Sequence, residues 1–177
     1  MSELATKDIA VLKDGSNLSL SFVVAGASQV QQRPKMSPKK GRRVPIYYDP
    51  SSLKKKDWKN DLKKALVNYG VSSFPFFKEK NTNNMQSDGL YIEVVFYIRR
   101  RQLDYRSKMR TKILKDECQK YPGTKDIDNM LKFVMDAYHD VLFDNDNCIV
   151  QVSASKKFVK EEEREKGAYT TIRISTI

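Results

Sequence analysis

The sequence is poor in the residues that build disulfide frameworks, zinc sites and membrane spans. Its two cysteines, Cys118 and Cys148, are far apart and form no CxxC motif, so we expect reduced thiols. A single histidine, His139, leaves few of the nitrogen and sulfur ligands that zinc prefers. The longest apolar runs, 22–27 and 94–98, are too short to cross a bilayer, and residues 1–10 lack the layout of a signal peptide. We therefore expect a soluble intracellular protein, cytoplasmic if bacterial or from a phage, and nuclear or at a viral replication site if eukaryotic.

Acidic residues are also in short supply. The 177 residues include 33 Lys and Arg against 22 Asp and Glu, which gives a net charge of +11. This balance favours a polyanionic partner such as nucleic acid over plain solubility or the lysine-rich composition of a source genome. A membrane surface is a weaker option, because no basic amphipathic helix with a broad apolar face stands out. The 40% hydrophobic content is enough for the core of one domain.

Hydrophobic periodicity and turn residues predict an α+β (α/β) domain with one mixed sheet flanked by helices. We expect a flexible N-terminal tail at 1–17, a folded domain at 18–177 and a long loop at 27–50. The predicted strands cover 18–26, 90–99, 148–158 and 168–177. The predicted helices cover 51–69, about 104–120, and 128 to about 143.

An acidic island interrupts this basic chain. Between residues 126 and 146 there are six aspartates and one lysine, so this segment carries −5 and the rest of the +11 chain carries +16. Asp126 and Asp128 are two residues apart just before a helix, where extended backbone can point both carboxylates the same way. Lys132 follows Asp128 by one turn on the same helix face. Asp146 lies in the turn that leads into the next strand.

Clustered carboxylates suit a hard divalent cation, which takes oxygen ligands. We therefore interpret Asp126, Asp128 and Asp146 as ligands for Mg²⁺, with Mn²⁺ as an alternative ion. Lys132 would neutralise charge on a phosphate. The spacing does not show that Asp146 approaches the other two carboxylates. The residues alone indicate metal-dependent chemistry on a polyanion.

Other interpretations of the same acids stay open. Asp128 can cap the helix that it precedes. Residues 144–146 look like the start of a Ca²⁺-binding loop, although the glycine and glutamate of an EF-hand are missing. Glu93 is a lone acid in an apolar strand, and it is either a further ligand or a solvent-facing residue.

Two basic clusters lie upstream of the island. Residues 33–43 contain six basic residues and no acidic one, with prolines and a glycine that exclude a regular helix. We expect this loop to contact DNA phosphates, and the arginines after the strand at 90–99 to form a second contact. The predicted contacts are Arg33, Lys35, Lys39, Arg42 and Arg43, followed by Arg99, Arg100 and Arg101.

Three spaced elements in residues 125–150 together resemble a known family. They are D-I-D-N-x-x-K at 126–132, D-A at 136–137, and an acidic stretch at 144–146 before I-V at 149–150. This order resembles the RusA family of Holliday junction resolvases, over about residues 18–177. Lys35 stands where the basic loop of that family commonly has a second Arg, and Asn145 where the family often has Asp.

The resemblance implies a small homodimer that binds branched DNA and cuts a four-way junction by paired symmetric nicks, with Mg²⁺. By motif position it implies that Asp126, Asp128 and Asp146 are the catalytic metal ligands and that Lys132 is the catalytic lysine. Two identical sites related by a two-fold axis suit a junction with approximate two-fold symmetry. The rival hypotheses are a basic nucleic-acid-binding module without catalysis, and a generic metal-dependent nuclease acting on flaps or RNA.

Overall fold

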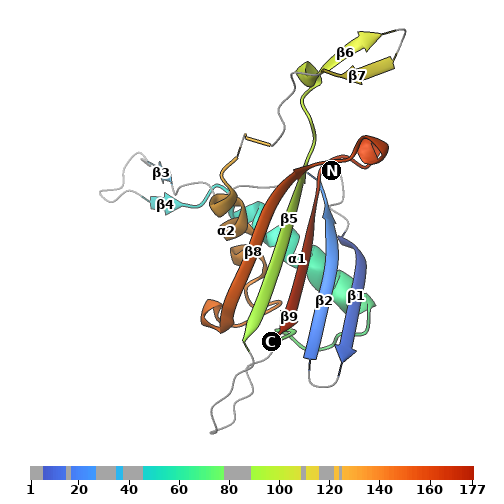
Figure 1. Ribbon diagram of the computed structural model, residues 1–177. Coiled ribbons are helices and arrows are strands. Elements are labelled where there is room, and N and C mark those ends of the chain that lie inside the picture. The colour runs from blue at the N-terminus through green and yellow to red at the C-terminus, as the bar shows by residue number, and fades with distance from the viewer. Residues whose placement is uncertain are drawn as a thin grey trace, which may run out of the picture.

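The computed structural model describes residues 6–14, 17–26, 35–37, 46–77, 89–108, 111–115, 122–123 and 125–177. The strands of the main sheet are β1 (Thr6–Asp14), β2 (Asn17–Ala25), β5 (Leu90–Ile98), β8 (Ile149–Phe158) and β9 (Tyr169–Thr176). Within the described ranges they form one five-stranded sheet in the order β1-β2-β9-β5-β8 (Figure 1). Neighbouring strands are antiparallel except β5 and β8, which are parallel. The predicted single α+β domain with one mixed sheet is confirmed.

Two helices, α1 (Ser52–Asn68) and α2 (Ile127–Tyr138), cover one face of this sheet (Figure 1). Alternate strand residues are buried beneath them, as the period of two along a strand requires. Aromatic side chains fill the space between the layers. Trp58 of α1 meets Phe133 of α2 edge-on at 5.3 Å between ring centroids, and Tyr138 meets Phe22 of β2 edge-on at 5.5 Å. None of the described helices is long and apolar enough to cross a membrane.

The predicted end of α1 is confirmed and that of α2 is wrong. Gly70 follows α1 with φ of 95°, a conformation in which glycine ends helices without strain. Helix α2 ends at Tyr138, several residues early, because Asp140 adopts φ of 63° and its N–H bonds to the carbonyl of Phe143. The next three residues, 141–143, are buried without being helical, which explains why their apolar spacing looked like another helical turn.

The helix predicted at 104–120 is wrong over the described residues 104–108 and 111–115, and residues 109–110 and 116–120 lie outside the described residues. The structure has a short 3-10 turn at Gln102–Asp104, followed by β6 (Tyr105–Lys108) and β7 (Thr111–Leu114), which pair as an antiparallel hairpin. Tyrosine, threonine and isoleucine in these segments favour strands over helices. The hairpin extends beyond the end of the main sheet (Figure 1).

The structure also has strands within the predicted flexible tail at 1–17 and within the predicted long loop at 27–50. Residues 6–14 pair with β2 as an antiparallel edge strand, whereas residues 1–5 lie outside the described residues. Partly buried Ile9 and Val11 pack against the core, which fixes this segment to the sheet. Within the expected loop, β3 (Lys35–Ser37) and β4 (Ile46–Tyr48) pair antiparallel. The expected loop residues at 27–34 and 38–45 lie outside the described residues.

Candidate active site

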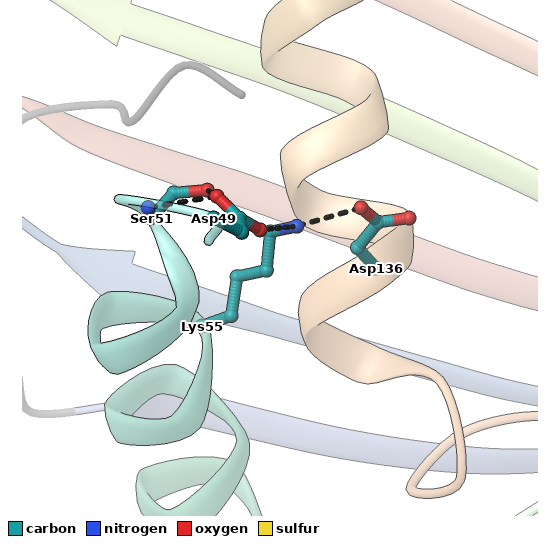
Figure 2. Close-up of polar contacts among 4 residues, drawn as sticks. All are labelled: Asp49, Ser51, Lys55 and Asp136. Atoms are coloured by element: carbon teal, nitrogen blue, oxygen red, sulfur yellow. Dashed lines mark hydrogen bonds and ion pairs between the residues drawn. The ribbon is translucent and has the colours of Figure 1, made fainter. Parts of the chain in front are cut away.

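Two of the six aspartates in the acidic island hold the helices together. Lys55 of α1 binds Asp136 of α2 at 2.7 Å, and one turn later Lys59 binds Asp140 at 2.7 Å (Figure 2 shows the first of these pairs). Lys55 also binds Asp49, at 2.8 Å, just before α1. Asp136 and Asp140 therefore help to hold α2 and the residues that follow it against α1.

The start of α1 makes further contacts with Asp49. Ser51 stands at the N-cap position, but its hydroxyl donates to the carboxylate of Asp49 instead of capping the helix (Figure 2). The backbone N–H of Ser51 donates to the same oxygen at 2.8 Å. The carboxylate of Asp49 thus accepts hydrogen bonds from both Ser51 and Lys55.

The protonation behaviour of this network follows from its bonds. Partial burial alone would lower the pKa of Lys55, but its bonds to Asp136 and Asp49 outweigh that effect and raise the pKa. Burial would raise the pKa of Asp49, yet the bonds from Lys55 and Ser51 lower it. The bond from Lys59 lowers the pKa of Asp140. These shifts favour the charged forms of Lys55, Asp49 and Asp140.

The N-terminal end of α2 carries the first predicted ligand pair. Asp126 occupies the N-cap position without a side-chain cap bond, and Asp128 lies in the first turn. Both side chains are exposed, as is Lys132 one turn further along. The carbonyl of Lys125 accepts a 2.6 Å hydrogen bond from Nζ of Lys156 in β8, which fixes this end of α2 against the sheet.

The third predicted ligand lies at the other end of α2. Asp146 is exposed at the start of a 3-10 turn, Asp146–Cys148, which leads directly into β8. Asn145 caps this turn, because its side-chain oxygen accepts from the N–H of Asn147 at 3.0 Å. Asn145 therefore has a structural role at the position where the family often has Asp.

The two ends of α2 are far apart along the sheet. Lys125 is bonded to Lys156, whereas Asp146 precedes Ile149, the first residue of β8. The seven residue steps from Ile149 to Lys156 span about 23 Å at the rise of a strand. The 12 residues of α2 likewise span about 18 Å. Asp126 and Asp146 of one chain are thus held on the order of 20 Å apart.

One copy of the chain accordingly does not assemble the predicted metal site. Among the described residues, no three Asp, Glu, His or Cys side chains come together to hold a metal ion. Glu93 does not help, because it lies on the sheet face opposite the helices, next to Arg173 of β9. The carboxylates themselves suit a hard cation, but their placement in a single copy does not.

The predicted DNA contacts divide into two groups. Arg99 and Arg101 are exposed where β5 ends, whereas Arg100 stacks on Phe158 with its guanidinium 3.8 Å from the ring centroid. Of the loop residues, Arg33, Lys39, Arg42 and Arg43 lie outside the described residues, and for Lys35 only the backbone, in β3, is described.

Comparison with known protein families decides the identity. The family model of the endodeoxyribonuclease RusA matches residues 26–173, most of the chain. The chain belongs to the RusA family. A search of curated proteins found no match.

Membership of the RusA family confirms the predicted class of enzyme. The protein is an endodeoxyribonuclease that hydrolyses phosphodiester bonds, from a family of Holliday junction resolvases that act on branched DNA with divalent metal. The match spans the acidic island, the basic loop and the hairpin between β5 and α2.

Sequence reasoning missed the base of the β6–β7 hairpin. Tyr105 donates to Glu161 at 2.9 Å, and the guanidinium of Arg164 lies 4.3 Å from the centroid of the Tyr105 ring. Burial and the bond to Glu161 raise the pKa of Tyr105. These contacts join the hairpin to the 3-10 turn Glu161–Lys166. The run of charges at 160–166 indicated only a solvated turn, and no local pattern signals its long-range partner.

Proposed function

We propose that this RusA-family enzyme resolves four-way DNA junctions by paired nicks in a Mg²⁺-dependent reaction. Asp126, Asp128 and Asp146 are the metal ligands of this proposal, and Lys132 pairs with the phosphate. The family match carries the reaction class. The exposure of all three carboxylates supports the choice of ligands, because Asp136 and Asp140 are already paired with lysines of α1.

The separation of the carboxylates makes a homodimer part of the proposal. A single copy holds Asp126 and Asp128 at one end of α2 and Asp146 beyond the other. A two-fold dimer contains two of each group, and an antiparallel arrangement brings unlike ends of the two copies together. Each site would then take Asp126 and Asp128 from one subunit and Asp146 from its partner. Two such sites match the two strands that a resolvase must nick.

The chain's own residues supply the remaining parts. Bound Mg²⁺ would stabilise the negative charge that develops on the scissile phosphate. Lys132 lies one turn after Asp128 on the same face of α2, where its ammonium group can neutralise a phosphate oxygen. Lys125 and Lys54 also bring positive charge to this end of α2. Partial burial and the charge of Lys54 lower the pKa of Lys125. Arg99 and Arg101 add positive charge beyond the sheet.

Cleavage of three substrates tests this function. A four-way junction, a flap and a linear duplex are incubated with the enzyme, with Mg²⁺ and with EDTA. We expect symmetric paired nicks in the junction only, and none in EDTA. The Asp126→Asn variant should lose cleavage by at least about a hundredfold while still binding the junction. Equal cutting of all three substrates would favour a generic nuclease, and binding without cleavage would favour a binding module.

A further inference from the structure

The β6–β7 hairpin is a two-stranded ribbon that stands outside the main sheet. Among the described strands, β6 and β7 pair only with each other, from Tyr105 opposite Leu114 to Lys108 opposite Thr111. The four residues of each strand give the ribbon a length of about 13 Å. It extends past the end of the sheet rather than lying on it (Figure 1). Isolated hairpins are marginally stable in water, so a ribbon placed here is suited to binding a partner.

Three hydrogen bonds fix the base of this ribbon to the domain. The buried carboxylate of Asp104 accepts from the N–H of Arg101 at 3.1 Å, and the carbonyl of Asp104 accepts from the N–H of Lys115 at 3.0 Å. The hydroxyl of Tyr105 donates to Glu161 at 2.9 Å. Both strands of the ribbon are therefore held where they leave the domain.

The charge of the ribbon indicates the class of its partner. Residues 105–115 contain five basic residues and no acidic one. Arg106 and Lys115 are exposed. Alternate strand positions belong to opposite faces, and paired positions share a face, so positions 106 and 108 lie on one face and position 112 on the other. Neither face is an apolar surface for a protein, and both suit a polyanion.

The ribbon leaves the sheet at the end that carries the first two candidate ligands. The bond between Lys156 and Lys125 holds the entry of α2, with Asp126, beside the C-terminal end of β8. Lys156 pairs with Phe96 of β5, and β5 ends two residues later on the way to the ribbon. DNA bound at Asp126 therefore has a neighbouring segment within reach of the ribbon.

The dimensions of the ribbon match one groove of duplex DNA. The major groove is about 12 Å wide and admits a two-stranded β-ribbon, whereas the minor groove is about half as wide. Successive residues of a strand and successive phosphates of a DNA strand both advance by about 3.4 Å. A ribbon of this length therefore covers about four base pairs.

We propose that the β6–β7 ribbon is a DNA-binding arm that enters the major groove of a duplex segment next to the cut site. This inference rests on the proposed function and adds a contact surface outside the carboxylate site. The basic residues of the arm neutralise phosphates on the groove walls. The bonds of Asp104 and Tyr105 at its base set the direction from which it meets the duplex.

Methylation footprinting of a four-way junction tests the arm. Dimethyl sulfate methylates guanine N7 in the major groove and adenine N3 in the minor groove, so one reagent distinguishes the two grooves. EDTA in place of Mg²⁺ keeps the junction uncut. We expect the wild-type protein to protect guanine N7 over about four base pairs of a duplex arm beside the cut site.

Removal of the ribbon provides the comparison. Tyr105 lies opposite Leu114, so residues 106–113 can be replaced by Asn-Gly, a two-residue turn that joins paired strands. The bonds of Asp104 and Tyr105 at the base are retained. We expect the shortened protein to bind the junction and to lose only the guanine protection on the duplex arm. Unchanged protection, or a loss at adenine N3 instead, overturns the proposal.

Point substitutions separate loss of the arm from damage to the fold. Arg106→Gln with Lys115→Gln should weaken junction binding and reduce the slope of log K against log salt by about 2. Lys13→Gln with Lys64→Gln is the matched control, because it removes the same charge from exposed positions on β1 and α1, and it should change neither quantity. Circular dichroism of each variant checks that the fold is intact. Equal salt slopes for the two double variants overturn the proposal.

The outcomes separate this arm from the proposed function. If the wild-type protein nicks junctions in pairs but removal of the ribbon leaves the footprint unchanged, the arm is wrong and the resolvase function stands. If removal erases the guanine protection but the wild type leaves junctions intact with Mg²⁺, the arm stands and the proposed function fails.

Discussion

Nζ of Lys156 donates a 2.6 Å hydrogen bond to the carbonyl oxygen of Lys125. This bond joins the N-terminal end of α2 to the C-terminal end of β8. It places Asp126 beside one end of the strand while Asp146 stands at the other. The chain thus keeps its two groups of candidate ligands apart as long as it is a single copy.

Loss of that bond should loosen the entry of α2. We expect Lys156→Met to lower the free energy of unfolding by about 1 kcal/mol, because a partly buried carbonyl loses its charged donor. Lys157→Met is the control, since Lys157 is exposed and points to the other face of the sheet. Urea unfolding of both variants measures the effect. Equal stabilities would show that the bond does not contribute.

The Lys55 network makes stability sensitive to acid. The folded-state pKa of Asp49 is lowered by its bonds from Lys55 and Ser51, so its stabilisation is present above the unfolded pKa of 3.8. That stabilisation is lost as the pH falls through the lower folded pKa. Asp140 behaves in the same way, through Lys59. We expect the free energy of unfolding to fall below about pH 4.

Removing Lys55 should weaken that acid dependence. We expect Lys55→Met to cost roughly 1–2 kcal/mol at pH 7, because two carboxylates lose a charged donor in a partly exposed site. Asp49 lacks its charged partner in this variant. The variant should therefore also lose less stability than the wild type between about pH 5 and about pH 2. Lys56→Met, on an exposed position of the same helix, is the control. Parallel pH curves for Lys55→Met and the wild type would contradict this account.

The hydroxyl of Tyr138 is buried, and among the described residues it has no hydrogen-bond partner. Burial also raises the pKa of this phenol well above its ordinary value. Tyr138→Phe removes a desolvated polar group and keeps the ring contacts with Phe22 and Trp58. We expect the variant to be as stable as the wild type or about 1 kcal/mol more stable in thermal unfolding. A clear loss of stability would reveal a partner for the hydroxyl.

Junction binding should depend steeply on salt. Basic residues that neutralise phosphates release counterions, and each contact adds about 0.9 to the slope of log K against log salt. Arg99→Gln with Arg101→Gln should therefore weaken binding and reduce the slope by about 2. Lys13→Gln, exposed on the distant β1 edge, should change neither. An affinity that does not vary with salt would contradict the assignment of these arginines.

Local periodicity predicted the elements that are regular over many residues. The alternation in 90–98 and the helical spacing in 52–68 each reflect a single buried face, so β5 and α1 were read correctly. The turn after Tyr138 was missed, because residues 141–143 are buried by tertiary packing. Their apolar spacing therefore resembles one more turn of the helix. The β6–β7 hairpin was missed because its register depends on pairing across a turn rather than on one repeating face.

The candidate site shows a different limit of sequence reasoning. The residue types at 126, 128, 132 and 146 predicted metal-dependent chemistry, and the family is one of divalent-metal-dependent nucleases. Spacing along the chain, however, does not give separation in space. Whether Asp146 meets Asp126 depends on the length of α2 and on where β8 begins. A symmetric partner leaves no repeating pattern in the sequence of one chain.

Mixing two inactive variants tests the shared site most directly. Asp126→Asn and Asp146→Asn are each expected to be inactive alone. In an equal, refolded mixture about half of the dimers are mixed, by random pairing of identical interfaces. Each mixed dimer then has one site with all its carboxylates and one site with both substitutions. We predict that the mixture regains single nicking of a supercoiled plasmid with an extruded cruciform. A mixture as inactive as either variant alone, under conditions in which wild type mixed with Asp126→Asn still nicks, would contradict a site shared between two copies.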